Sequence, residues 1–246
     1  MKSCRQIALM ILLVTICAGS VMANGNEAKS EVKNPLKVSV KFLSKHLWRG
    51  RPSGNTGSVE PDITWEINKN WSLSMWGGYC FDGSYQELDL YVTYKWKQFS
   101  FSLFDYYNPP SDSTFFSSQI TTFDNDKTLH LFDLKAGYQF KRIPLSFTAS
   151  TLIYGDDKTA GRNQRFSTYF EAVYTYKRSW GELSFLAGGT PHKSLYASKA
   201  KIVNLETSTT IPVKIARELK TNISGSIIYN PIRKESYFRA GLQVQL

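Results

Sequence analysis

From residue 36 to residue 246, the chain consists of stretches of roughly ten residues in which every second residue is apolar. In the last stretch the apolar members share one parity and the others the opposite parity (Phe238, Ala240, Leu242, Val244 and Leu246 against Tyr237, Arg239, Gly241, Gln243 and Gln245). Alternation with a period of two places these sets on opposite faces of a β-strand. Strands of about 9–11 residues can cross the hydrocarbon core of a bilayer when tilted.

The connections between about twelve such stretches fall into two kinds that alternate along the chain. Loop-like connections, such as 49–57 and 108–127, follow the odd-numbered stretches, the first of which is expected at 36–48. Tight connections, such as 68–70 and 97–98, follow the even-numbered stretches. Single-chain bacterial barrels have an even number of antiparallel strands, short periplasmic turns and longer outer loops. The sequence therefore predicts an all-β fold, a transmembrane antiparallel up-and-down β-barrel of about 12 strands.

Aromatic residues of apolar parity gather near the tight connections (Trp65, Trp71, Trp96, Phe99, Tyr138, Phe140, Tyr174 and Tyr176). Amphipathic rings favour the boundary between lipid and water. These residues are expected to form a girdle at the periplasmic side. The alternative is a secreted two-sheet sandwich, in which aromatic residues would instead concentrate in the middle of strands.

The N-terminus has the pattern of an export signal. Lys2 and Arg5 precede an apolar run, and small residues end the segment at Ala23. We expect a signal peptide at 1–23, a flexible periplasmic tail at 24–35 and the barrel at 36–246, in the outer membrane of a Gram-negative bacterium. Cleavage leaves Cys80 as the remaining cysteine, so an internal disulfide is not expected.

The formal net charge of +10 at neutral pH raises the question of a nucleic-acid partner. In a barrel, however, the basic residues fall in turns and the aromatic residues at lipid-facing positions. The barrel topology explains both features, so no nucleic-acid partner is expected.

Acidic residues outnumber basic residues at positions of inward parity. The candidate pore-lining residues are Lys41, Glu60, Asp62, Trp76, Glu87, Asp89, Tyr91, Asp133, Lys135, Glu171 and Arg239. Rings of Asp and Glu favour cations, which predicts a weak cation preference; alternatively, these charges pair across the lumen and fill it. Barrels of about eight strands are filled by side chains, whereas 16–18 strands leave an aqueous channel. An intermediate number of strands favours a small or partly occluded pore.

The longest connection, 108–127, contains three phenylalanines, Phe115, Phe116 and Phe123, which are candidates for a constriction loop. A loop of this length folds into the mouth as a constriction, presents a contact surface as in an adhesin or structural barrel, or is an ordinary mobile loop. The sequence leaves these three readings open.

An enzyme is the other class of function to weigh, because some barrels of this size hydrolyse lipids with a Ser/His pair. His46, His130 and His192 fall near strand ends or loops, and serines are abundant. The chain contains no G-x-S-x-G, phosphate-binding or paired-cysteine motif, and its histidines are too scattered to indicate a metal site. We expect no enzyme activity, no catalytic residues, no metal and no cofactor.

Two short motifs resemble a known family. The run Leu47-Trp48-Arg49-Gly50 and the run Glu87-Leu88-Asp89-Leu90-Tyr91 are similar to segments of the TorF-type outer-membrane porin family. The resemblance implies a pore. The expected function is a small porin that passes small polar solutes or ions. Its expected partners are outer-membrane lipid, the barrel-assembly machinery and the solutes themselves.

Overall fold

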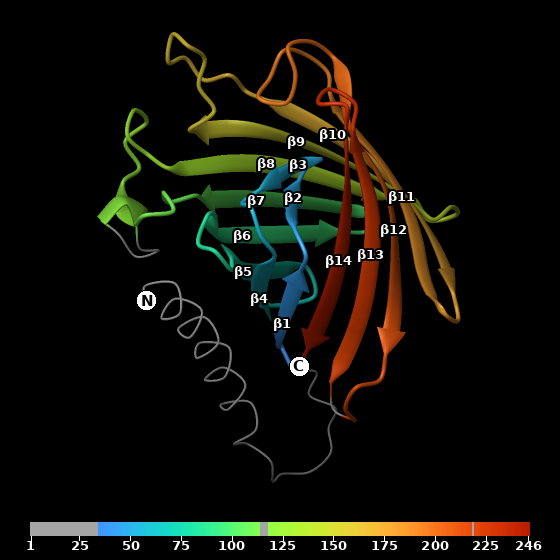
Figure 1. The fold of residues 1–246 in the computed structure, drawn as a ribbon. Coiled ribbons are helices and arrows are strands. Elements are labelled where there is room, and N and C mark those ends of the chain that lie inside the picture. The colour runs from blue at the N-terminus through green and yellow to red at the C-terminus, as the bar shows by residue number, and fades with distance from the viewer. Residues whose placement is uncertain (1–33, 114–117, 218) are drawn as a thin grey trace.

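The chain forms a closed antiparallel β-barrel of twelve strands, as the alternation predicts (Figure 1). The computed structural model describes residues 34–113, 118–217 and 219–246. The wall strands are β1 (Leu36–Leu43), β4 (Ser58–Glu66), β5 (Trp71–Cys80), β6 (Gln86–Trp96), β7 (Phe99–Tyr107), β8 (His130–Gln139), β9 (Leu145–Gly155), β10 (Thr168–Arg178), β11 (Gly181–Thr190), β12 (Lys201–Val213), β13 (Lys220–Asn230) and β14 (Glu235–Gln245). The barrel closes because β1 pairs with both β4 and β14.

The predicted signal peptide (1–23) lies outside the described residues, as does the tail predicted at 24–35 except for its last two residues. Both assignments stay predictions. The helix in the described part of the chain is the short η1 (Ser118–Thr121). No helix in that part is long and apolar enough to cross a membrane.

Every connection of ten or more residues between wall strands lies at one end of the barrel, as predicted. One end carries the short connections, such as 97–98 between β6 and β7 and 179–180 between β10 and β11. The other end carries the long connections, including 108–129 between β7 and β8 and 156–167 between β9 and β10, together with two short ones, 81–85 and 231–234. We call these the short-turn end and the long-loop end.

The outer face of the wall is apolar. Leu134 in the middle of β8 has 52% of its surface exposed, and Ile227 and Phe238 on the adjacent strands β13 and β14 are exposed by 64% and 68%. Near the short-turn end the exposed side chains are aromatic, among them Trp65, Trp71, Trp96, Phe99, Phe140, Tyr174 and Tyr176. This distribution matches the predicted girdle and is typical of a wall that faces lipid.

The first strand is shorter than predicted. Its alternation suggests a strand at 36–48, but β1 ends at Leu43, where the chain leaves the wall. The next residues form β2 (His46–Trp48) and β3 (Arg51–Ser53), which pair only with each other (blue in Figure 1). The prediction was wrong here because the alternation of a short hairpin continues that of the strand before it.

An arginine on the outer face should destabilise the barrel more than one on the inner face. Leu134→Arg places a charge at a central lipid-facing position, which costs about 2–4 kcal/mol near the bilayer midplane. Ser208→Arg is the matched control, because Ser208 lies near the centre of β12 and lines a cavity inside the barrel. Urea unfolding in lipid vesicles measures the difference, and equal losses of stability for the two variants would contradict the assignment of the faces.

Candidate functional site: a hairpin across the barrel bore

The residues that leave the wall after β1 form a tight hairpin. Trp48 pairs with Arg51, and the two residues between them, Arg49 and Gly50, have φ angles of 51° and 75°. Two positive φ angles are typical of the type I′ turn, which matches the twist of the flanking strands. A Cβ at Gly50 would lie 2.8 Å from the carbonyl oxygen of Val203 in β12, so glycine also allows the turn to approach the wall. We call residues 46–53 the bore hairpin.

The tip of the bore hairpin is fixed by a buried arginine. Arg49 Nη2 lies 2.6 Å from Asp133 Oδ2 on β8 and 2.7 Å from Ser150 Oγ on β9. The side chains of Arg49 and Asp133 are 8% and 0% exposed. Removing one partner of such a buried ion pair leaves an uncompensated charge and costs about 3–5 kcal/mol. The pair therefore holds the hairpin against the wall.

Aromatic rings surround the Arg49 guanidinium. Its central carbon lies 4.6 Å from the ring centroid of Trp48, 4.7 Å from that of Tyr169 and 5.2 Å from that of Tyr196. Tyr169, Tyr196 and Val203 form a buried cluster against which Trp48 packs. Cations over aromatic faces are attracted by the ring quadrupole, and more strongly where water is excluded. The long-loop end of the bore thus contains a packed core.

Further contacts attach the bore hairpin to other parts of the wall. Asn230 Nδ2 at the end of β13 donates to the carbonyl oxygen of Gly50 at 3.0 Å. At the other end of the hairpin, His46 Nδ1 lies 2.8 Å from Glu60 Oε1 on β4. The His46 ring also stacks on Tyr85, with the ring centroids 5.1 Å apart. The hairpin consequently spans the interior from β4 to β8, β9 and β13.

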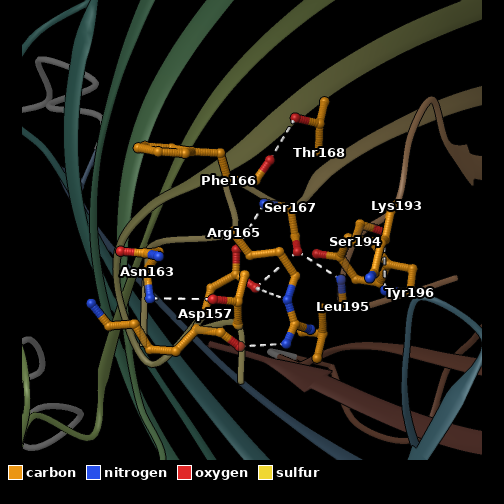
Figure 2. Close-up of polar contacts among 12 residues, drawn as sticks. Asp157, Asn163, Arg165, Phe166, Ser167, Thr168, Lys193, Ser194, Leu195 and Tyr196 are labelled. Carbon is orange, nitrogen blue, oxygen red and sulfur yellow. Dashed lines mark hydrogen bonds and ion pairs between the residues drawn. The ribbon is translucent and has the colours of Figure 1, made fainter. Parts of the chain in front are cut away.

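Two outer loops hold Tyr196 over Arg49, and Figure 2 shows their contacts. Ser167 Oγ donates to Asp157 Oδ1 at 2.8 Å, and the backbone N–H of Leu195 donates to Ser167 Oγ at 2.7 Å (Figure 2). Asp157 and Ser167 are 1% and 0% exposed. The neighbouring Tyr196 accepts a hydrogen bond from Arg49 Nη1. Burial raises the pKa of Tyr196 to about 12, so this hydroxyl is neutral at physiological pH.

Predicted pore-lining residues share one face of the wall. The strand register places Lys41 opposite Glu60, and Trp76 between Asp62 and Asp89. Three of the predicted residues contact the bore hairpin directly. Glu60 meets His46, the Trp76 ring lies 5.6 Å from the His46 ring, and Asp133 meets Arg49.

The other predicted pore-lining residues have polar or aromatic partners, or line a cavity. Among the acids, Asp62 accepts a hydrogen bond from the Tyr91 hydroxyl at 2.8 Å, Glu171 from the Tyr169 hydroxyl at 3.1 Å and Glu87 from Asn108 at 2.9 Å, and Asp89 is 7% exposed. Among the bases, Lys135 Nζ lies 3.5 Å from the ring centroid of Phe104 and 4.0 Å from Asp133, and Arg239 lies 2.7 Å from Glu206. Lys41 lines a cavity described below. Their role in a pore stays a prediction.

The candidate constriction loop packs on the outside of the barrel where it is described. The Phe123 ring lies 4.4 Å from the His130 ring and 6.4 Å from the Phe132 ring. His130 and Phe132 pair with Tyr107 and Asp105 and so carry the outer parity of β7 and β8. Phe115 and Phe116 lie outside the described residues. The segment that enters the bore is the bore hairpin, which follows β1.

The histidines have partners other than serine hydroxyls. His46 meets Glu60, His130 Nδ1 lies 2.8 Å from Asp105 Oδ1, and His192 Nδ1 lies 2.8 Å from the carbonyl oxygen of Lys193. Among residues 34–113, 118–217 and 219–246, no histidine ring is hydrogen-bonded to a serine. The same residues contain no group of three or more His, Cys, Asp or Glu side chains placed to hold a metal ion.

Comparison with known proteins gives likenesses of fold only. No family model matches the chain, and no curated protein matches it. Among solved structures it is similar to the KdgM porin, with a TM-score of 0.47 and 10% identity over 85% of this chain and 97% of that chain. It is also similar to the NanC porin, with a TM-score of 0.45 and 11% identity over 85% of this chain and 97% of that chain. It is similar, too, to an outer membrane channel from Pseudomonas putida F1, with a TM-score of 0.41 and 10% identity over 88% of this chain and 99% of that chain.

Replacement of Arg49 should release the bore hairpin without unfolding the wall. Arg49→Ala removes the contacts to Asp133, Ser150 and Tyr196, whereas the closed ladder of the wall needs none of them. Limited trypsin digestion of the folded protein in lipid should then cut after Lys45, whereas the wild type should resist cleavage there.

Arg162→Ala is the control for this experiment, because Arg162 forms an exposed ion pair with Asp126 in the outer loops. It should leave Lys45 protected. If Arg49→Ala is as resistant as the wild type, Arg49 is not the anchor of the hairpin.

Proposed function

We propose that the protein is an outer-membrane channel of a Gram-negative bacterium that passes small polar solutes or ions. The observation that carries this proposal is a closed barrel with an apolar outer face and a charged interior that a hairpin crosses. Such a barrel satisfies its backbone hydrogen bonds within lipid and keeps its polar groups away from it. Outer-membrane lipid and the barrel-assembly machinery are the partners that this placement requires. The resemblance to the TorF-type family agrees with the proposal and stays a prediction.

The proposed bore is narrow. Twelve strands fall between the barrels of about eight strands that side chains fill and the 16–18 strands that leave an aqueous channel. The bore hairpin occupies part of this interior, and its packing around Trp48 and Arg49 closes much of the long-loop end. We therefore propose a channel of low conductance in which the bore hairpin sets the limiting width.

The proposed channel has a weak preference for cations. Asp62 and Glu171 take neutral hydroxyl partners, Tyr91 and Tyr169, and both carboxylates are partly exposed. Other inner-face acids are offset by cations, as Asp133 is by Arg49 and Glu206 by Arg239. Acidic groups without an ion-pair partner favour cations in a pore. Because several inner-face acids, including Asp133 and Glu206, are paired with cations, the preference should be small.

Single-channel recording in planar bilayers tests the width. Replacing residues 46–53 with a Gly-Ser linker of equal length removes the bore hairpin and leaves the wall strands intact. The wild type should give small discrete steps, and the variant should give steps several times larger. A wild type that stays silent although correctly folded would count against a channel, and equal steps in the two proteins would show that the hairpin does not limit the bore.

The reversal potential under a salt gradient tests the selectivity in the same recordings. Asp62→Asn with Glu171→Gln should reduce the cation preference of the wild type. Asp112→Asn is the control, since Asp112 is an exposed acid in an outer loop and should leave the reversal potential unchanged. An anion-selective wild type would overturn this part of the proposal.

A further inference from the structure

Beneath the bore hairpin lies a cavity of about 260 Å³. Its roof includes Leu43, His46 and Leu47, and its walls are the inner faces of β12, β13, β14 and β1. It continues toward the short-turn end, where Thr210 and Asn222 line it. We call this cavity the vestibule.

The vestibule is lined by hydroxyl groups that other protein groups do not use. Ser208, Thr210 and Ser224 face it, and within the described residues their hydroxyls make no hydrogen bond to the protein. Elsewhere on the inner face, neighbouring hydroxyls bond to each other. Thr93 and Ser102 lie 2.8 Å apart, and Thr175 and Ser184 lie 3.1 Å apart. The wall of the vestibule therefore offers donors and acceptors to a molecule in the bore.

The charges around the vestibule are balanced. Arg239 lies 2.7 Å from Glu206, and Lys41 stands opposite Glu60 in the register of β1 and β4. A site with equal numbers of cations and carboxylates attracts neither an anion nor a cation strongly by charge alone. Its hydrogen-bonding groups are therefore the main source of selectivity, which favours a neutral ligand.

The volume of the vestibule and the residues of its roof restrict the class of ligand further. Pockets for drug-sized ligands measure about 300–1,000 Å³, so the vestibule suits a somewhat smaller molecule. Leu43 and Leu47 supply apolar surface above the hydroxyl-lined wall. A sugar ring has the complementary form, because its C–H groups present an apolar face and its hydroxyls project around the rim.

We propose that the vestibule is a binding site for a neutral polyhydroxylated solute of the size of one sugar ring. The inference rests on the proposed channel function and names the class of solute that the channel passes. Such a solute stacks its C–H face under Leu47 and exchanges hydrogen bonds with Ser208, Thr210 and Ser224.

Saturation-transfer-difference NMR of the protein in nanodiscs tests this binding, with D-glucose as the probe. The triple variant Ser208→Ala/Thr210→Val/Ser224→Ala removes the free hydroxyls with little change of shape. Saturation should pass to the glucose ring protons with the wild type, and binding to the triple variant should be weaker by about tenfold or more, because each lost hydrogen bond lowers affinity.

The control variant Thr93→Val/Ser102→Ala removes a hydroxyl pair that is already satisfied on another part of the wall, and it should bind glucose as the wild type does. No transfer with the wild type, or equal transfer with the triple variant, would overturn the proposal. A heat-induced shift in gel mobility verifies the folding of each variant. This experiment measures binding independently of conduction. Glucose binding to a barrel that does not conduct would reject the proposed channel and retain the binding site. Conduction without glucose binding would retain the channel and reject the site.

Discussion

Closure of the hydrogen-bonded ladder is the constraint on which the rest of the structure depends. Lipid offers no partners for backbone N–H and C=O groups, so a sheet that spans a membrane must leave no open edge. Here β1 meets this requirement by pairing with β14 on one side and β4 on the other. The apolar face can then point outward along every strand, and the charged residues of the inner face are enclosed in the bore.

Enclosing those residues creates a second problem, which the bore hairpin solves. A twelve-stranded ring has more internal space than its own side chains fill, and buried charges need partners. Arg49 supplies one for Asp133, and His46 meets Glu60. The same contacts position Leu47 above the vestibule. A single short segment thus satisfies wall charges, fills the long-loop end and forms the roof of the remaining cavity.

The wall strands could be predicted from the sequence because the pattern that specifies each strand lies within that strand. The alternation in β14 and the positions of Trp65, Trp71 and Trp96 depend only on which side chains of a strand face lipid. The structure confirms both predictions. The bore hairpin could not be predicted in this way. Arg49 and Asp133 are 84 residues apart, and nothing in the local pattern tells a loop to turn inward.

The outer loops show the same limit. The phenylalanines of 108–127 made this loop a candidate constriction, but alternation does not report the direction in which a loop folds, and Phe123 packs against the outer side of β8. One local signal for the hairpin did exist. Gly50 suits the second central position of a type I′ turn, and that turn is what allows a two-residue reversal inside the barrel.

The central claim is that the bore hairpin is docked inside the folded barrel. Amide hydrogen exchange of residues 46–53 in the lipid-embedded protein tests it most directly, because docked and free hairpins differ in their access to water. The account predicts that these amides exchange slowly, at rates close to those of the wall strands. Exchange as fast as that of an exposed loop, with the wall strands protected, would contradict it.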